Sequence, residues 1–215
     1  MAEKVKCTIV SGAPESDYDF LRENTDLNSF IIAADSGYKK LEAIGITPDL
    51  IVADFDSCRR PETETEIIDY PVRKDATDTF NAVKIATDKG YKNILLLGAL
   101  GGRLDHSYSN ILCLDYAMKH GACCTIADRN HRISLIRERA VIDKSYQWFS
   151  LFAFLDDAKG IRIKGAGYEA GFYGKESLDM KPYDQFGQSN YVKDEYCEIT
   201  AESGTLLLIE ANDFR

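Results

Sequence analysis

The first 130 residues alternate short apolar runs with amphipathic segments, and this rhythm restricts the fold more than any other feature of the chain. Strand-like runs are predicted at 5–10, 30–34, 50–53, 67–72 and 94–97. Segments with helical spacing follow at 38–44, 78–88 and 107–119. Strands that alternate with helices are typical of a parallel α/β sheet, in which ligands gather at the carboxyl ends of the strands. The sequence therefore predicts a Rossmann-like α/β domain over residues 1–130.

The pattern changes after residue 130, because short alternating runs replace the helical segments. Strand-like runs are predicted at 133–136, 148–155, 161–163, 195–200 and 205–209. Gly, Asp and Asn turns separate them, as in antiparallel sheets, so we expect a C-terminal β-sandwich domain over residues 131–215, with Trp148 in its core. A length of 215 residues and a hydrophobic content of 45% exceed what one small domain needs.

The first of three acidic clusters follows the apolar run 50–53. Side chains alternate along an extended backbone, so Asp54 and Asp56 should point to the same side. Two such carboxylates suit Mg²⁺, which proteins usually hold with one or two carboxylates together with substrate phosphates. The alternative is a polar turn in which a carboxylate caps the next segment.

The second cluster opens the predicted helix 78–88, with Thr77 or Asp75 as its cap and Gly90 as its stop. Asp78 then lies in the first helical turn, where we expect a third metal ligand. A carboxylate there is also favoured by the helix dipole alone. Lys74 is a cation beside a possible anion-binding helix end, and we expect it to contact phosphate.

The third cluster, Gly98-Ala99-Leu100-Gly101-Gly102-Arg103-Leu104-Asp105-His106, joins a strongly apolar strand to a helix. Its glycines let backbone N–H groups approach a phosphate, Arg103 offers a planar fork for phosphate oxygens, and Asp105 adds a carboxylate. The alternative is a flexible turn with a solvated arginine. A lone histidine such as His106 is more often a hydrogen-bonding residue than a base. The glycine patterns of P-loop and dinucleotide-binding proteins are absent from the sequence.

These motifs, in this order, resemble the thiamine pyrophosphokinase family. The resemblance spans nearly the whole chain and rests on Ala33-Ala34-Asp35-Ser36-Gly37, Pro48-Asp49, Asp54-Phe55-Asp56-Ser57, Thr77-Asp78, Gly101-Gly102-Arg103-Leu104-Asp105-His106, Ser189-Asn190 and Gly204-Thr205-Leu206-Leu207. Ala53 departs from the glycine that is usual in the family.

The resemblance implies transfer of the pyrophosphoryl group of ATP to the hydroxyl of thiamine, which gives thiamine pyrophosphate and AMP. It implies that Asp54, Asp56 and Asp78 hold Mg²⁺ and that Arg103 and Lys74 bind phosphate. Asp35, Thr77, Gly101 and Gly102 would join them in binding the nucleotide. Asp105 would orient the thiamine hydroxyl or accept its proton, and Ser189 and Asn190 would bind thiamine. The α/β domain would then be catalytic and the β domain thiamine-binding.

The resemblance further implies a homodimer with the active site at the subunit interface. An aromatic residue of the stretch 172–191 could stack on thiamine, although each ring could equally seal the sandwich edge. Two other functions stay open at this point. The first is a pyrophosphokinase for another alcohol, such as a hydroxymethylpterin, and the second is a non-catalytic thiamine or nucleotide sensor.

Charge and cysteine content restrict the partners and the compartment. The formal net charge of -9 argues against a nucleic-acid surface and favours cationic thiamine. The six cysteines show no Cys-x-x-Cys spacing, as expected for reduced residues. No signal peptide or membrane segment is apparent, so we expect a cytoplasmic enzyme without membrane contact.

Overall fold

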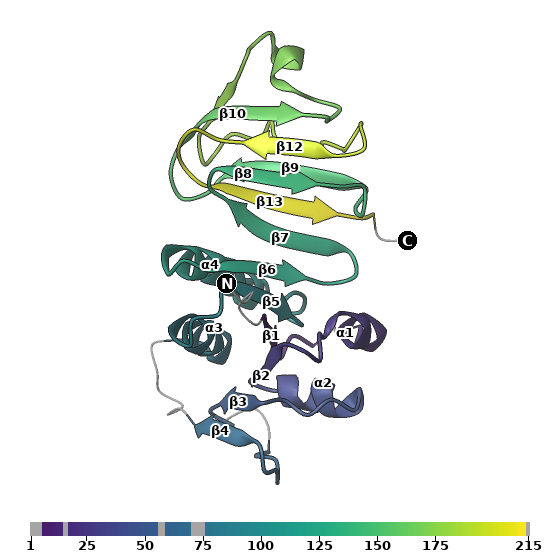
Figure 1. The fold of residues 1–215 in the computed structure, drawn as a ribbon, viewed down its shortest axis with the longest axis vertical. Coiled ribbons are helices and arrows are strands. Elements are labelled where there is room, and N and C mark those ends of the chain that lie inside the picture. Colours follow the sequence, from purple (N-terminus) through teal and green to yellow (C-terminus); the bar gives the residue numbers. More distant parts are fainter. Residues whose placement is uncertain (1–5, 15–16, 56–58, 70–75, 214–215) are drawn as a thin grey trace. The chain divides into compact units, whose positions relative to one another are not determined.

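The computed structural model describes residues 6–14, 17–55, 59–69 and 76–213. It separates into two compact units, Met1–Arg129 and Asn130–Arg215 (Figure 1). The first unit is a parallel α/β structure and the second consists of antiparallel sheets, which confirms the predicted fold class. The roles predicted for the two domains remain predictions.

The first unit is built on a parallel sheet with the strand order β4-β3-β2-β1-β5-β6. Its strands are β1 (Cys7–Val10), β2 (Phe30–Ala34), β3 (Leu50–Ala53), β4 (Glu66–Asp69), β5 (Asn93–Leu97) and β6 (Cys123–Ala127). The order reverses at β1, which pairs with β2 on one side and β5 on the other. A crevice therefore opens beyond the carboxyl ends of β1 and β5, where open α/β sheets bind their ligands.

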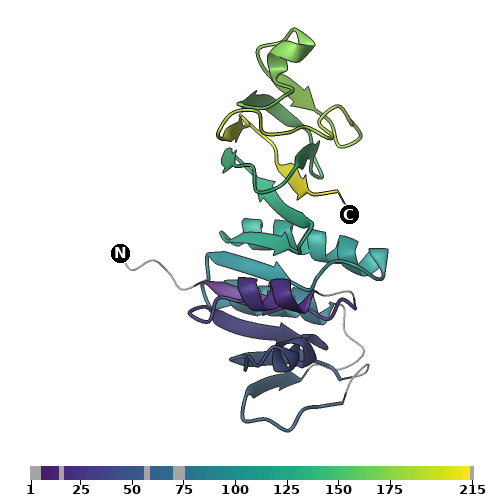
Figure 2. The same cartoon turned by 90° about the vertical axis from the view of Figure 1, so that its right-hand side faces the viewer.

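Helices cover both faces of this sheet. They are α1 (Tyr18–Asn24), α2 (Gly37–Ala43), α3 (Asp78–Asp88) and α4 (Leu104–Lys119). In Figure 1, α1 and α2 lie on one face and α3 and α4 on the other, and Figure 2 looks onto the face that carries α1 and α2. The core buries apolar residues of strands and helices together, including Val10, Leu41, Ile51 and Leu97.

The boundaries of these elements follow local signals. Helix α3 begins where Thr77 Oγ1 accepts a hydrogen bond from the Phe80 amide, and Gly90 follows its last turn with a φ of 84°, so the predicted bounds and cap are confirmed. Helix α4 begins earlier than expected, at Leu104, because Arg103 takes the N-cap position. Helix α1 and strand β6 were not predicted.

The second unit contains two antiparallel groups of strands. One pairs β7 (His131–Ile136) with β13 (Leu206–Ala211), and β13 with β9 (Trp148–Ala153). The other has the order β11 (Leu178–Met180), β10 (Ala158–Lys164), β12 (Cys197–Thr200) and β8 (Arg139–Ile142). Both groups contribute to one buried cluster, with Phe149 and Leu206 from the first and Ile161 and Ile199 from the second. The 3₁₀ helix η1 (Ala170–Tyr173) follows β10.

Trp148 is not in this core, which corrects the expectation for it. It is half-buried, whereas Phe149, Leu151 and Ala153 of the same strand are buried. The strand alternates its side chains, and the register with β13 turns the odd-numbered residues of β9 inward.

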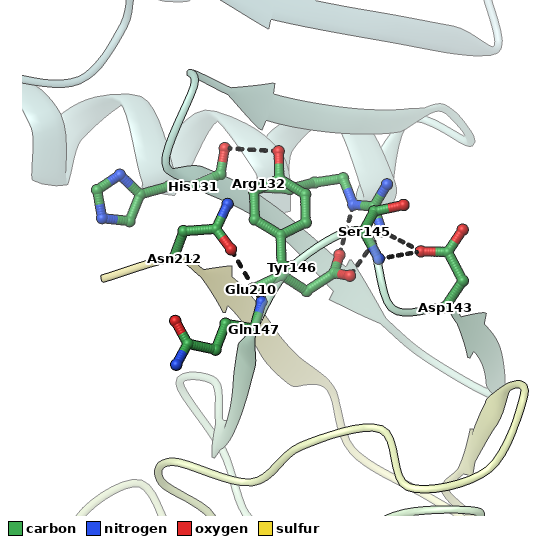
Figure 3. A network of polar contacts seen from close by, with 8 residues as sticks. All are labelled: His131, Arg132, Asp143, Ser145, Tyr146, Gln147, Glu210 and Asn212. Atoms are coloured by element: carbon green, nitrogen blue, oxygen red, sulfur yellow. Dashed lines mark hydrogen bonds and ion pairs between the residues drawn. The ribbon is translucent and has the colours of Figure 1, made fainter. Parts of the chain in front are cut away.

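A polar network ties β7 to β13 at the position where Arg132 and Glu210 face each other (Figure 3). Arg132 Nε lies 2.5 Å from Glu210 Oε2 and its Nη2 lies 2.6 Å from Oε1. Glu210 is only 2% exposed, and its carboxylate raises the pKa of Arg132. The guanidinium lies 5.1 Å from the ring centroid of Tyr146, so the pair also fixes the turn that leads into β9.

Candidate active site

A cavity of about 470 Å³ lies at the carboxyl ends of the sheet strands in the first unit. Residues from the ends of β1, β2, β3 and β5 and from the N-terminal turns of α3 and α4 surround it. They are Ser11, Gly12, Ala13, Pro14, Asp35, Asp54, Thr77, Asp78, Thr79, Ala99, Gly101, Gly102, Arg103, His106 and Asn110. The structure thus brings together Asp35, Asp54, Thr77, Asp78, Gly101, Gly102 and Arg103 from motifs that are far apart in the sequence.

Asp54 and Asp78 meet at one wall of this cavity. The Asp54 amide donates to Asp78 Oδ2 at 3.4 Å, although the residues are 24 positions apart. Asp78 is 8% exposed and begins α3, where the N-terminal dipole stabilises its negative charge. Both residues line the cavity, and carboxylate oxygens are the ligands that Mg²⁺ prefers, so their chemistry suits that ion.

Two predicted residues of this wall, Asp56 and Lys74, lie outside the described residues. Among residues 6–14, 17–55, 59–69 and 76–213, no three His, Cys, Asp or Glu side chains are grouped closely enough to hold a metal ion. The predicted trio of Asp54, Asp56 and Asp78 therefore stays a prediction, supported at present by the contact between its first and third members.

Backbone strain marks the strand ends that carry the acidic residues. Asp35 follows β2 with a φ of 52°, and Phe55 follows Asp54 with a φ of 55°. Left-handed conformations of non-glycine residues cost of order 1–3 kcal/mol and persist where the surroundings enforce them. The Asp35 side chain packs closely against the backbone of Gly12, because a Cβ on Gly12 would lie 2.6 Å from Asp35 Oδ2. A side chain at position 12 would therefore force the Asp35 carboxylate and the Ser36 hydroxyl to move.

The loop after β5 needs its glycines for similar reasons. Gly101 and Gly102 have φ values of 97° and 64°, which side chains rarely adopt. A Cβ on Gly102 would also lie 2.6 Å from Pro14 Cγ. This loop therefore packs directly against the residues that follow β1, and together they form a backbone-rich floor for the cavity.

Arg103 and Asp105 form an exposed ion pair at the rim. Arg103 Nε lies 3.1 Å from Asp105 Oδ1, and Nη2 lies 2.5 Å from Oδ2. The guanidinium lowers the pKa of Asp105 to about 2, chiefly through this hydrogen bond. A carboxylate with such a pKa is a weak base near neutral pH. Asp105 does not line the cavity, and its predicted role toward the thiamine hydroxyl stays a prediction.

Several cavity residues were missed by sequence reasoning. Residues 11–14 line the cavity because β1 lies beside β5, and no motif marks them in the sequence. Ser11 Oγ and Thr79 Oγ1 share a buried hydrogen bond of 2.5 Å, and Asn110 Nδ2 donates to the Ala99 carbonyl at 2.8 Å. Small polar residues directly after the first strand were the one available signal.

The residues predicted to bind thiamine lie in the second unit. Asn190 is 4% exposed, and its amide group holds the Tyr168 backbone through bonds of 2.8 Å and 3.0 Å. Its neighbour Ser189 has a φ of 57° and donates its amide to Ser150 Oγ at 3.1 Å. Asn190 thus has a structural task, and substrate binding by either residue stays a prediction.

Exposed aromatic side chains gather around this segment. The rings of Tyr168, Phe172, Tyr173, Phe186 and Tyr191 form edge-to-face contacts with centroid separations of 4.9 to 6.1 Å. Trp148 contacts Tyr191 at 6.4 Å. The rings keep each other in place while leaving apolar surface exposed, which suits recognition of a flat cation but does not single out one ring.

Comparison with known proteins gives the family. A family model for the catalytic domain of thiamin pyrophosphokinase matches residues 21–126. Thiamine pyrophosphokinase of Bacillus subtilis (strain 168) is 28% identical over 169 residues, which cover 74% of this chain and 79% of that protein. The chain belongs to the thiamin pyrophosphokinase family. Thiamine pyrophosphokinase 1 of Oryza sativa subsp. japonica is 39% identical over 77 residues, 30% of this chain and 29% of that protein.

Solved structures of the thiamin pyrophosphokinase family share the fold. The crystal structure of thiamine pyrophosphokinase from Bacillus subtilis superposes with a TM-score of 0.86 at 22% identity, and covers 97% of this chain and 100% of that chain. Thiamin pyrophosphokinase from Candida albicans gives a TM-score of 0.73 at 17% identity, with coverage of 98% and 90%. Both likenesses extend over the two units, so the whole chain has the family's fold.

Proposed function

We propose that this chain is a thiamine pyrophosphokinase, which transfers the pyrophosphoryl group of ATP to the hydroxyl of thiamine and releases AMP. The observation that carries the proposal is the cavity in which Asp35, Asp54, Asp78 and the loop 101–103 meet. A phosphate-accepting loop, an arginine and paired carboxylates are the parts that phosphoryl transfer requires. Family membership supports thiamine over other acceptors.

On the ATP side, each group has a distinct task. The backbone N–H groups of Gly101 and Gly102 donate to the polyphosphate at close range, and Arg103 donates to its oxygens through its planar guanidinium. Asp54 and Asp78 would hold Mg²⁺, with Asp56 as the proposed third ligand. When bound, this ion neutralises charge on the phosphate oxygens and aligns them for attack. Lys74 and Thr77 are proposed to complete the phosphate contacts, and Asp35 to bind the nucleoside.

The transfer is a single displacement at the β-phosphorus of ATP. The thiamine hydroxyl oxygen forms the new bond, and the bond from the β-phosphorus to the oxygen shared with the α-phosphate breaks. AMP leaves with that oxygen, and the hydroxyl proton passes to water or to a carboxylate such as Asp105. Because Arg103 engages Asp105 and keeps it ionised, release of this ion pair would have to precede any proton transfer to Asp105.

Thiamine binding is assigned to the second unit, through Ser189, Asn190 and one of the exposed aromatic rings. We further propose a homodimer in which the α/β unit of one subunit and the β unit of the other complete each site. The described cysteines, Cys7, Cys113, Cys123, Cys124 and Cys197, are free thiols, in keeping with the proposed cytoplasmic location. No helix in the described part of the chain is long and apolar enough to span a membrane.

The function is tested by incubating the purified protein with ATP, Mg²⁺ and thiamine, beside a reaction with a hydroxymethylpterin, and identifying products by mass. Thiamine pyrophosphate with one equivalent of AMP is expected. Thiamine monophosphate with ADP would mean attack at the γ-phosphorus. A pyrophosphorylated pterin alone would replace the acceptor, and no product from either alcohol would favour a sensor.

A further inference from the structure

Lys40 is a buried lysine that lies beneath the candidate active site without lining it. It belongs to α2 and is 6% exposed, whereas its neighbour Lys39 points to solvent. Its Nζ donates to the Ser11 carbonyl at 2.9 Å and to the Ala13 carbonyl by a second hydrogen bond. Both carbonyls belong to residues 11–14, here called the β1 loop, which lines the cavity.

Burial of this ammonium group is costly and therefore calls for an explanation. Lysine is rarely buried unless it is paired. Burial lowers the pKa of Lys40 to about 8, and the negative charge of Asp35 opposes that shift. A methionine or leucine would fill similar space at lower cost. What such residues cannot do is donate hydrogen bonds to two carbonyls of the same loop.

Three further polar groups of the β1 loop are bound by residues that follow β5 or precede α2, or by β5 itself. The amides of Ser11 and Ala13 donate to the Leu97 and Gly98 carbonyls at 2.8 Å and 2.9 Å. The Gly12 carbonyl accepts a bond from Ser36 Oγ at 3.5 Å. The carbonyls of three successive loop residues are thus bound by side chains of α2 and its cap. A carbonyl oxygen that turned into the cavity would repel phosphate oxygens, whereas backbone N–H groups attract them.

We propose that Lys40 is a positioning residue for the nucleotide: it holds the carbonyls of Ser11 and Ala13 so that the β1 loop presents a surface compatible with the ATP polyphosphate. This role rests on the proposed function, because it takes ATP as the occupant of the cavity. Lys40 itself touches neither substrate. Its loss lets the loop carbonyls turn, which weakens the nucleotide site and leaves the thiamine site unaffected.

The test compares Lys40→Met with Lys39→Met, since both remove one lysine charge from adjacent positions of α2. Affinity for ATP with Mg²⁺ is measured by calorimetry without thiamine, KM and kcat are measured for both substrates, and thermal unfolding checks the fold. For Lys40→Met we expect roughly 10- to 100-fold weaker ATP binding with a matching rise in the ATP KM, as for carbonyls left without a donor. The thiamine KM should change less than about twofold, and Lys39→Met should match the wild type within about twofold.

Unchanged ATP affinity in a folded Lys40→Met protein, whatever its melting temperature, overturns the positioning role. The proposed function is unaffected by that result as long as the wild type turns over ATP and thiamine. Equal losses in both lysine variants would assign the effect to net charge and also overturn it. If Lys40→Met fails to fold, Lys40→Gln, whose side chain is one atom shorter and ends in one uncharged donating group, is judged by the same criteria. A wild type that neither binds ATP nor forms product overturns the proposed function and this role together.

Discussion

Asp78 has a structural role and a proposed role as a metal ligand, and the two roles make different demands on its charge. As the first residue of α3 it benefits from the helix dipole, and its Oδ2 accepts the Asp54 amide. A hydrogen bond needs only an oxygen acceptor, which asparagine also offers. Holding a divalent cation needs the negative charge, so replacing the carboxylate by an amide separates the roles.

Asp78→Asn should therefore keep the fold and lose at least about 100-fold in kcat, because charge neutralisation of the polyphosphate depends on this group. Product formation with ATP, Mg²⁺ and thiamine gives kcat, and thermal unfolding checks the fold. Asp88→Asn is the matched control, since Asp88 ends the same helix and pairs with exposed Lys84 at 2.6 Å. Near wild-type turnover of Asp78→Asn would remove it from the metal site.

Lys40 should also leave a signature in the pH dependence of stability. Its pKa is about 8 in the folded protein and near 10.5 in the unfolded chain, so between these values the unfolded state binds more protons. The free energy of unfolding therefore rises with pH across that window because of this residue, by up to about 3 kcal/mol. In urea unfolding at pH 7 to 10, the free energy of unfolding of the wild type should increase with pH relative to that of Lys40→Met. Parallel curves would mean that Lys40 titrates normally.

Loops, rather than regular elements, carry the contacts that shape the cavity. The loop after β5 approaches the β1 loop at Gly102 and Pro14, and the Asn110 side chain of α4 fixes the Ala99 carbonyl from below. Helix α3 contributes its N-terminal turn through Thr77, Asp78 and Thr79. Each of these segments is attached to a strand of the sheet, which explains how backbone atoms far apart in sequence keep a fixed geometry.

Gly102→Ala should weaken ATP binding at least about 10-fold, because a methyl group there meets both a φ of 64° and the Pro14 ring at 2.6 Å. Gly45→Ala is the control, since Gly45 has a φ of 75° with nothing within 4 Å of the added Cβ. Calorimetry with Mg²⁺ and ATP separates the two effects. Equal ATP affinities in both variants would show that the contact with Pro14 is unimportant.

At the scale of the whole molecule, each unit has its own core and its own means of stabilisation. The first relies on a parallel sheet covered on both faces by helices, and the second on a buried cluster shared by two antiparallel groups of strands. The Arg132–Glu210 pair adds to the second unit an ionic contact whose carboxylate is buried. Trp148, the single tryptophan of the chain, lies in that unit and reports on its unfolding.

Glu210→Gln should destabilise the second unit by about 2 kcal/mol, because the buried position 210 then offers half-buried Arg132 a weaker, uncharged partner. Tryptophan fluorescence during urea unfolding follows this unit. Glu198→Gln is the matched control, since its pair with Arg139 at 2.6 Å is exposed, and exposed pairs contribute less than about 1 kcal/mol. Equal effects of both changes would show that burial of Glu210 adds nothing.

The sequence by itself determined the elements whose signals are local. Strands β2 and β3 and helix α3 have the predicted bounds, because apolar periodicity, a threonine cap and a glycine stop are properties of neighbouring residues. The ordered motifs likewise predicted seven of the fifteen residues that line the cavity, and they predicted the family to which the chain belongs. The short helix α1 was missed because its one buried residue, Leu21, gives no periodic pattern.

Only the tertiary structure decided which segments meet. The placement of β1 beside β5 brings the β1 loop into the site, and the bond between Ser11 and Thr79 joins residues 68 positions apart. The orientation of Trp148 depends on its register with β13, and the burial of Lys40 on a loop 27 to 29 residues away. Local patterns cannot encode such pairings, because strand order and register are selected by the packing of the whole core.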